Sequence, residues 1–245
     1  MTTTPVPVPT VLPPEYMTLL KNVAPVVGVF TSTAIGFGPL TAVLKARKNR
    51  SLGDINPDPF PVLFGNAIGW IIYAAATRNI YIYGGNVVNV MMGIWYLMTA
   101  YGLTTSEGLR RKMEILTVLF TGLWTVLGFY CAMIDDEAFR INLLGIVCNV
   151  IVIILFASPL TTAIKVIQTK NSVSISRPFA AIQLVNCGLW TGYGLAVGDY
   201  YVWVPNTIAF VLGVIQAVLI CVYPVPPSAA TLEEPFMSDN DDRSA

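Results

Sequence analysis

Long apolar stretches, separated by short segments in which the charged residues gather, dominate the pattern of hydrophobic and polar positions along this chain. Seven such stretches are present, at residues 19–44, 58–77, 80–104, 113–134, 141–164, 179–197 and 200–223. A helix needs roughly 20 apolar residues to cross about 30 Å of hydrocarbon, and lipid offers no hydrogen-bond partner to backbone N–H and C=O groups. The pattern therefore predicts an all-α membrane protein with seven transmembrane helices.

An internal repeat is superimposed on this pattern. At a constant offset of 120 residues, Asn66, Trp70, Tyr73 and Asn86 recur as Asn186, Trp190, Tyr193 and Asn206, and Pro39-Leu40-Thr41 recurs as Pro159-Leu160-Thr161. Each copy contains three predicted helices, an odd number, so the second copy enters the membrane in the same direction as the first only after one extra crossing. The unmatched stretch 113–134 supplies that crossing. The sequence therefore predicts two parallel three-helix bundles in a 3+1+3 arrangement, joined by a linker helix.

These features divide the chain into five predicted segments. They are a flexible N-terminus (1–17), a first triple-helix bundle (18–108), a linker transmembrane helix (109–136), a second triple-helix bundle (137–224) and a disordered cytosolic tail (225–245). The N-terminal segment is rich in Pro and Thr, and the tail is rich in Pro and acidic residues. Neither composition supports a packed core.

The composition agrees with a chain embedded in lipid. It is 55% hydrophobic and 11% charged, with a mean hydropathy of +0.66 and a formal net charge of zero, whereas a soluble domain carries about 25% charged residues. The balanced charge gives no basis for nucleic-acid binding. The chain has no histidine, and its cysteines form no CxxC pair. We therefore expect no metal site and no cofactor.

The basic residues indicate the orientation. Ten of them lie in the loops after the first, third and fifth stretches, namely Lys45, Arg47, Lys48, Arg50, Arg110, Arg111, Lys112, Lys165, Lys170 and Arg177. The opposite side holds Lys21, Arg78 and Arg140. Because basic loops remain in the cytosol, we expect an integral multi-pass protein with its N-terminus outside or lumenal and its C-terminus cytosolic. Charge does not distinguish the vacuolar membrane from the plasma membrane.

Asn86 and Asn206 are the first candidates for a binding site, because they occupy equivalent depths in the third and seventh stretches. An amide donates and accepts hydrogen bonds without carrying charge, which suits a substrate with many hydroxyl groups. The alternative is a hydrogen bond that holds two helices together. Because the pair is symmetric, we favour substrate contact at the interface of the two repeats.

Two asparagine–tryptophan pairs are the second candidates. Asn66 and Trp70, like Asn186 and Trp190, are four residues apart and share one helix face. An indole presents a flat apolar face to a substrate, while amides can bind the hydroxyl groups of that substrate. The alternative is an aromatic belt at the membrane interface.

Arg78 and Asp199 lie near the outer ends of the second and sixth stretches, at almost equivalent positions. We expect them to pair as part of an outer gate, and solvated loop charges are the alternative.

Four prolines are also related by the repeat. Pro39 and Pro159 fall inside the first and fifth stretches, where a proline kinks a helix and can form a hinge.

Pro59 and Pro178 begin the second and sixth stretches, with an offset of 119 rather than 120 residues. They can also act as hinges, and a helix start is the alternative for them.

The repeated residues are similar to those of the SWEET sugar transporters (the MtN3/saliva family). The resemblance spans residues 18–224 and is carried by Gly38-Pro39-Leu40, Ser158-Pro159-Leu160, Asn66-x3-Trp70-x2-Tyr73, Asn186-x3-Trp190-x2-Tyr193, Asn86 and Asn206. The chain resembles the plant members most, including those of the vacuolar membrane.

The resemblance implies roles for these residues. The sugar contacts in the family match Asn86, Asn206, Trp70 and Trp190, and the positions that bear on substrate size match Asn66 and Asn186. The resemblance also implies that Tyr73 and Tyr193 belong to the outer gate, and an aromatic belt at the membrane interface is the alternative for them. It further implies that a tetrad of prolines, here Pro39, Pro59, Pro159 and Pro178, acts as hinges.

Bidirectional facilitated transport of a sugar is the function that these features predict. No charged residue lies well inside any stretch, and proton-coupled transporters need an intramembrane carboxylate or histidine. We therefore expect passive uniport by alternating access around a midplane site. Trp70 and Trp190, together with Asn66 and Asn186, narrow the predicted cavity and favour a monosaccharide such as glucose over a disaccharide such as sucrose. The expected partners are the sugar, the lipid bilayer and further copies of the chain in a homo-oligomer such as a trimer.

Three other classes fit the sequence less well. A seven-helix receptor is not expected to show a 3+1+3 duplication, and the seventh stretch contains no lysine for a retinal Schiff base. An enzyme is not expected, because HExxH, GxSxG and an intramembrane pair of acids are absent from the sequence. A scaffold remains as an alternative, and it should show no thermal stabilisation by sugars.

Overall fold

The computed structural model describes residues 13–53 and 55–225, and every regular element within them is helical. The elements are α1 (Pro14–Thr18), the π-helical turn η1 (Leu19–Val23), α2 (Ala24–Gly36), α3 (Leu40–Asn49), α4 (Pro59–Ala76), α5 (Ile80–Leu103), α6 (Glu107–Ala132), α7 (Glu137–Leu155), α8 (Ala157–Thr169), α9 (Arg177–Val197) and α10 (Tyr200–Val222). Segments α1 to α3 form one crossing and α7 with α8 another. The predicted all-α fold of seven helices is therefore confirmed.

The ends of the chain lie mostly outside this description. Residues 14–17, which we expected to be flexible, belong to the short helix α1. The remainder of the predicted flexible N-terminus, residues 1–12, and the predicted disordered tail from residue 226 lie outside the described residues.

Polar residues cap several helices just before the apolar pattern begins. Asn79, Ser106, Asp136 and Asp199 accept hydrogen bonds from N–H groups in the first turns of α5, α6, α7 and α10. Because Ser106 caps α6, this helix begins at Glu107 rather than at residue 113, where its apolar stretch begins.

Five helical segments of the described chain are long and apolar enough to cross a membrane: Pro14–Asn49, Pro59–Ala76, Glu107–Ala132, Glu137–Thr169 and Tyr200–Val222. Helices α5 and α9 have 24 and 21 residues, a sufficient length, but are less apolar. They carry Asn86, Asn89, Gln183 and Asn186. The residues that make them less apolar thus include members of the predicted substrate site.

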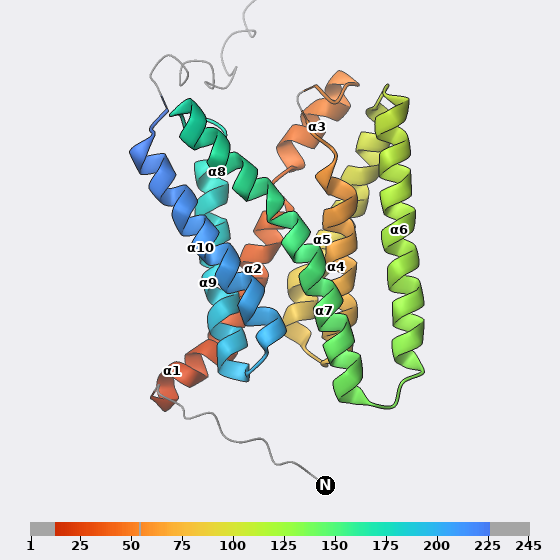
Figure 1. Cartoon of the computed structure of the whole chain (residues 1–245), viewed down its shortest axis with the longest axis vertical. Coiled ribbons are helices and arrows are strands. Elements are labelled where there is room, and N and C mark those ends of the chain that lie inside the picture. The colour runs from red at the N-terminus through yellow and green to blue at the C-terminus, as the bar shows by residue number, and fades with distance from the viewer. Residues whose placement is uncertain (1–12, 54, 226–245) are drawn as a thin grey trace, which may run out of the picture.

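The first helix of each repeat crosses from one half of the molecule to the other (Figure 1). Helix α2 packs against α9 of the second repeat and α5 of its own, and its continuation α3 contacts α5. In the same way α7 packs against α4 of the first repeat, and its continuation α8 contacts α10. Both α2 and α7 begin towards the lower end of Figure 1, so the two repeats are parallel, as predicted.

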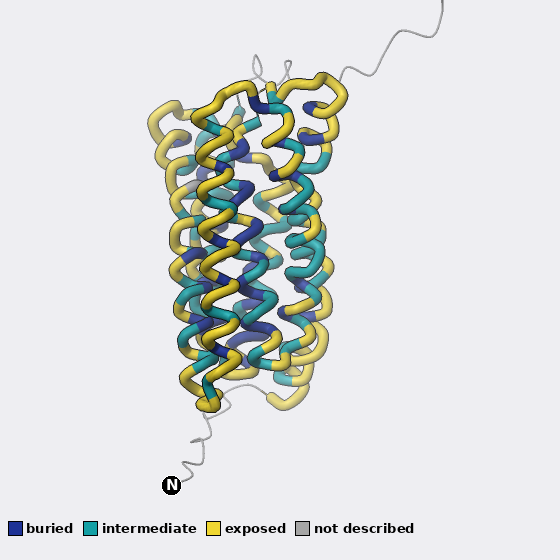
Figure 2. The backbone as a smooth tube through the Cα atoms, turned by 90° about the vertical axis from the view of Figure 1, so that its right-hand side faces the viewer, coloured by how far each residue is buried: buried dark blue, intermediate teal, exposed yellow. Residues whose placement is uncertain are grey.

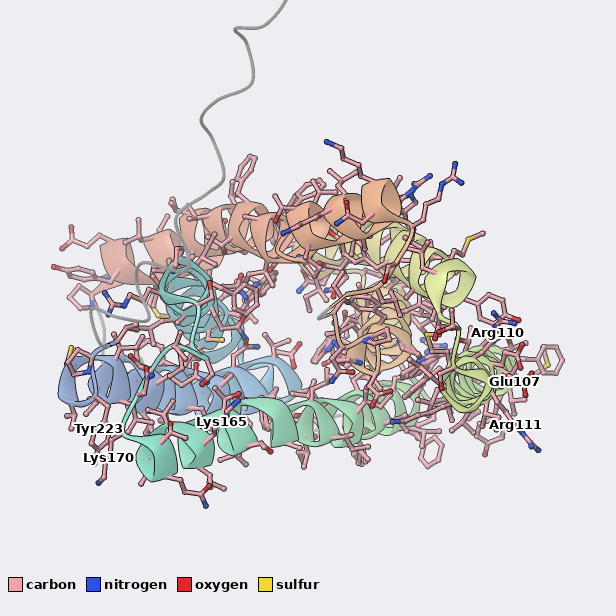
Figure 3. All side chains as sticks on the ribbon, turned by 90° about the horizontal axis from the view of Figure 1, so that it is seen from above. Glu107, Arg110, Arg111, Lys165, Lys170 and Tyr223 are labelled. Atoms are coloured by element: carbon pink, nitrogen blue, oxygen red, sulfur yellow. The ribbon has the colours of Figure 1, made fainter. Side chains whose placement is uncertain are left out.

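The two ends of the molecule differ in chemistry. We call the lower end in Figure 1 the tyrosine end, because Tyr73 and Tyr193 lie in the last turns of α4 and α9 there. We call the upper end the basic end. Figure 3 looks onto the basic end and labels Arg110 and Arg111 at the start of α6, and Lys165 and Lys170 at the end of α8.

The two ends also differ in packing. At the tyrosine end one apolar cluster combines both repeats and includes Trp70, Tyr73, Trp190, Tyr193 and Tyr201. At the basic end the core divides into a first-repeat cluster around Val43, Phe60 and Tyr96 and a second-repeat cluster around Val166, Ile175 and Leu219. Figure 2 shows many exposed residues along the outer faces of the helices, where a bilayer would contact them. The repeats are therefore packed together at the tyrosine end and separately at the basic end.

Pro39 and Pro159 lie at breaks in the first helix of each repeat, but the breaks differ. Three residues separate the end of α2 from the start of α3, and Pro39 is the last of them. A single residue, Phe156, separates α7 from α8, and Pro159 lies in the first turn of α8. The first repeat therefore has the wider break at this position.

Pro59 and Pro178 lie in the first turns of α4 and α9. A proline is tolerated there because the first N–H groups of a helix have no partner within the helix. The geometry of these two prolines is thus that of helix starts, and a hinge role for them stays a prediction.

The linker helix α6 packs directly on α4. Phe120 and Trp124 lie one turn apart and are buried against Gly65 and Gly69, where an added Cβ would overlap their rings. The Trp124 Nε1–H donates a hydrogen bond of 2.7 Å to the Gly65 carbonyl. Glycine is required at these two positions because the helices approach closely.

An ion pair also joins the linker to the first repeat. Lys112 Nζ lies 2.7 Å from Asp58 Oδ2, just before α4 begins. In the second repeat Val185 and Leu189 occupy the positions of the two glycines. The repeats are therefore unequal at this surface, and α6 is attached to the helix that carries Asn66 and Trp70.

Candidate functional site

Asn86 and Asn206 have the same environment in α5 and α10. The Asn86 Nδ2 donates to the Ile82 carbonyl at 2.9 Å, and the Asn206 Nδ2 donates to the Val202 carbonyl at 2.8 Å. Both side chains are half-buried. Among the described residues neither amide bonds to another helix in this conformation. Each therefore retains its oxygen and one N–H for a ligand.

Trp70 and Trp190 are buried, with 8% and 7% of their surfaces exposed. Each meets the tyrosine of its own helix edge-on, with ring centroids 5.5 Å apart for Trp70 and Tyr73 and 5.8 Å apart for Trp190 and Tyr193. The edge-on arrangement is a favourable contact between two aromatic rings. The two indoles are thus held in matching positions on α4 and α9.

Trp190 in addition lies against the first repeat. A Cβ added at Gly28 of α2 or at Gly85 of α5 would approach the indole to 3.2 or 3.0 Å. The Trp190 side chain therefore packs directly on the backbone of two glycines, and this permits the close contact of α2 with α9.

The polar atoms of Asn186 and Trp190 are bound by α2. The Asn186 Oδ1 accepts hydrogen bonds from Thr31 Oγ1 at 2.8 Å and from Ser32 Oγ at 2.9 Å. The Trp190 Nε1–H donates to Ser32 Oγ at 3.0 Å. These bonds connect the two repeats at the depth of the predicted site.

Asn66 lacks the equivalent partners. Its Oδ1 is buried and has no hydrogen-bond partner among the described residues. The positions of Thr31 and Ser32 are occupied in α7 by Ile151 and Val152, which belong to or pack against the apolar cluster that contains Trp70. The site that we predicted as symmetric is therefore asymmetric in its hydrogen bonds.

Two equivalent hydrogen bonds close the tyrosine end. The Tyr73 hydroxyl donates to Asp199 Oδ1 at 2.9 Å, and the Asn79 Nδ2 donates to the Tyr193 hydroxyl at 2.6 Å. Asn79 and Asp199 are 120 residues apart and cap equivalent helices. Each bond joins one repeat to the other, so the structure brings the predicted gate residues Tyr73, Tyr193 and Asp199 together.

The expected pairing of Arg78 with Asp199 was wrong for this conformation. Arg78 is exposed and left-handed (φ 53°), like its counterpart Gly198 (φ 74°). Within the described parts of the chain the ion pair is Lys112 with Asp58, and Asp199 bonds to Tyr73 instead. The true counterpart of Asp199 is Asn79, which the repeat offset could have identified.

Burial raises the pKa of the Asp199 carboxyl above its ordinary value, while the hydrogen bonds from the Tyr73 hydroxyl and the backbone N–H groups of α10 oppose that shift. Asp199 lies at the helix cap rather than inside a membrane-spanning segment. It is therefore a partly buried carboxyl whose charged form is stabilised by the hydrogen bond from Tyr73.

Pro205 lies inside α10, directly before Asn206. Because proline has no N–H, the Tyr201 carbonyl one turn earlier loses its partner within the helix. The Asn149 Nδ2 of α7 donates to this carbonyl at 3.1 Å. A neighbouring side chain thus replaces the missing bond. Neither position is shared by the two repeats, so the comparison of repeats did not reveal them.

The site as a whole presents neutral amides, hydroxyl groups and aromatic faces, a set suited to a neutral ligand with many hydroxyl groups. Groups of three or more side chains that could hold a metal ion are not found in the described residues.

Comparisons with known proteins agree with this chemistry. The family described as a sugar efflux transporter for intercellular exchange (MtN3_slv) matches residues 23–108 and 142–228, the two repeats. Sugar transporter SWEET1 of Dictyostelium discoideum is 30% identical over 80% of this chain and 90% of its own length. Bidirectional sugar transporter SWEET5 of Arabidopsis thaliana is 25% identical, over 83% of this chain and 86% of its own length.

A solved structure of a eukaryotic SWEET transporter has the same fold. Its TM-score is 0.79 at 20% identity, and the match covers 85% of this chain and 98% of that chain. Sugar transporter SWEET1 of Homo sapiens, at 29% identity over 80% of this chain and 87% of its own length, is as similar as the relatives above. The narrower expectation of a plant, vacuolar member stays a prediction. The chain belongs to the SWEET family, whose members are sugar transporters and not enzymes.

Proposed function

We propose that this protein transports a monosaccharide such as glucose in both directions by passive uniport. The carrying observation is that Asn86 and Asn206 share one geometry in the two repeats and each retain an amide oxygen without a partner among the described residues. The two buried indoles support a sugar between them, because an aromatic face packs well on the apolar face of a sugar ring. A disaccharide such as sucrose is the alternative substrate and needs a larger cavity.

The proposed mechanism is alternating access. In the observed conformation the tyrosine end is closed by the two crossed hydrogen bonds and by one apolar cluster that both repeats share. Separate clusters at the basic end allow the repeats to move relative to each other there. Rocking would break the contacts at the tyrosine end and bring the repeats together at the basic end. We expect the breaks at Pro39 and Pro159 to take part as hinges.

Passive transport is supported by the position of the charged groups. Asp199 caps α10 at the tyrosine end and lies outside the helix that carries Asn206. A proton-driven mechanism usually has an ionisable relay within the membrane. We also propose that the basic end faces the cytosol, in the vacuolar or the plasma membrane, and that the chain forms a homo-oligomer such as a trimer.

Uptake of labelled glucose and sucrose into proteoliposomes tests this proposal. We expect glucose uptake that a protonophore does not abolish and that Asn86→Ala and Asn206→Ala each greatly reduce. Asn49→Ala, which changes an exposed asparagine at the end of α3, is the control and should transport normally. Full transport by both site variants would refute the assignment of the site. Loss of uptake with the protonophore would refute passive transport.

A further inference from the structure

The Ser32 hydroxyl bridges two residues that lie one turn apart on α9. It accepts a hydrogen bond from the Trp190 Nε1–H at 3.0 Å and lies 2.9 Å from Asn186 Oδ1. An indole nitrogen can only donate and an amide oxygen can only accept. The single hydrogen of Ser32 is therefore directed to Asn186, and the hydroxyl satisfies both groups at once.

Helix α4 presents the same two groups without the bridging hydroxyl. Asn66 and Trp70 are one turn apart, as Asn186 and Trp190 are, and Val152 occupies the position of Ser32. The Asn66 Oδ1 is buried and unpaired within the described residues. Nor does the Trp70 Nε1–H have a hydrogen-bond partner in the described part of the chain. An acceptor and a donor are thus without a partner among the residues that the structure describes, where the other repeat holds a hydroxyl group.

We propose that the place of the missing hydroxyl is a subsite for one hydroxyl group of the transported sugar. That hydroxyl would accept from the Trp70 Nε1–H and donate to the Asn66 Oδ1, as Ser32 does between Trp190 and Asn186. The proposal rests on the proposed function, because it requires a sugar at the interface of the repeats. It adds that the two repeats bind the sugar unequally.

The asymmetry gives the sugar a defined orientation. On α9 the amide oxygen and the indole N–H are already satisfied by α2, so a sugar hydroxyl gains little by replacing them. On α4 the unpaired buried oxygen of Asn66 is costly until a donor reaches it. A hydroxyl that can both donate and accept is the group that satisfies this subsite.

Val152→Ser is the direct test, since it places in α7 the hydroxyl that Ser32 supplies in α2. The new hydroxyl should occupy the subsite and compete with the sugar. We expect the KM for glucose uptake to rise about threefold to tenfold, the value of one hydrogen bond in a membrane protein, with Vmax nearly unchanged. Val152→Ala removes the same methyl groups without adding a hydroxyl, and its KM should stay within about twofold of the parent.

Sugar analogues test the same subsite without relying on a new side chain. In a series of monodeoxy and monofluoro glucoses, one ring position should show a raised KM for both changes, because fluorine cannot donate a hydrogen bond to Asn66. Asn66→Leu, which keeps a similar volume, should abolish that penalty at that position alone. Asn186→Leu is the matched control and should leave the penalty in place.

The outcomes separate the two proposals. If the unchanged protein transports no sugar, the proposed function and the subsite both fail. If it transports glucose but Val152→Ser equals Val152→Ala and no analogue penalty disappears in Asn66→Leu, the subsite alone is refuted.

Discussion

Tyr73 donates a hydrogen bond of 2.9 Å to Asp199 across the interface of the two repeats, and the repeat-related bond runs from Asn79 to Tyr193 at 2.6 Å. The two bonds are equivalent in position but opposite in direction, because the tyrosine donates in one and accepts in the other. Asn79 and Asp199 also cap α5 and α10. The two hydrogen bonds that close the tyrosine end therefore involve the cap residues of two helices. Because they are made by side chains, they can break without unwinding either helix.

Tyr73→Phe should weaken closure of the tyrosine end, because it removes one of the two bonds and keeps the aromatic ring. A hydrogen bond to a charged group contributes about 1.5–3 kcal/mol, so the open form should become about tenfold to a hundredfold more populated. A membrane-impermeant maleimide that reacts with a cysteine introduced at Ala76 would measure this. Tyr83→Phe is the control, because Tyr83 is exposed at the same end. Equal labelling of the two variants would contradict the role of Tyr73.

Asp199→Asn should remove a pH dependence of stability. Burial raises the pKa of this carboxyl in the folded protein above its ordinary value of 3.8, so the folded state binds the proton more tightly than the unfolded state. The protonated carboxyl therefore stabilises the folded state fully when the pH is below the ordinary pKa. This stabilisation is lost as the pH rises through the raised pKa of the folded protein. The Tm of the parent minus that of Asp199→Asn should therefore fall as the pH rises from about 4 to 7. A difference that is constant or increases with pH would contradict the assignment.

Gly69→Ala should destabilise the protein, because the added methyl group would overlap the Trp124 indole in the contact between α4 and the linker helix α6. Overpacking of a close contact costs about 1–3 kcal/mol. Gly122→Ala, on α6, meets no atom within 4 Å and should be neutral or slightly stabilising, because alanine favours a helix. Thermal unfolding in detergent compares the two variants. The linker does not support α4 if both give the same Tm.

The helices could be predicted from the sequence because they depend on local spacing, and the repeat offset identified the candidate residues that share an environment in the two repeats. The lengths of the apolar stretches determine the crossings, and the helical period places Asn66 and Trp70 on one face. Asn79 could have been predicted too, since it lies 120 residues before Asp199. Arg78 lies one residue before the position equivalent to Asp199, and its own counterpart is Gly198, which shares its left-handed backbone.

The contacts between repeats could not be predicted in the same way. Ser32 binds Asn186 and Trp190 because α2 crosses to the second repeat before α3 returns to its own. The apolar pattern of α2 contains no information on which repeat it faces at a given depth. The hydrogen bond of Asn149 likewise depends on the angle at which α7 passes α10.

Asn149→Leu should destabilise the protein by about 1–3 kcal/mol, because it leaves the Tyr201 carbonyl without a partner in an apolar environment. The Asn149 Nδ2 lies 3.1 Å from this carbonyl, whose helical partner is missing at Pro205. Pro205→Ala restores an N–H at residue 205, so in that background the same change to leucine should cost much less. Thermal unfolding of the two single variants and the double variant measures the coupling, which should reach about 1 kcal/mol. Additive effects would mean that Asn149 does not compensate for the proline. Glucose uptake by the same variants would show whether Asn206, which directly follows Pro205, depends on the hydrogen bond from Asn149.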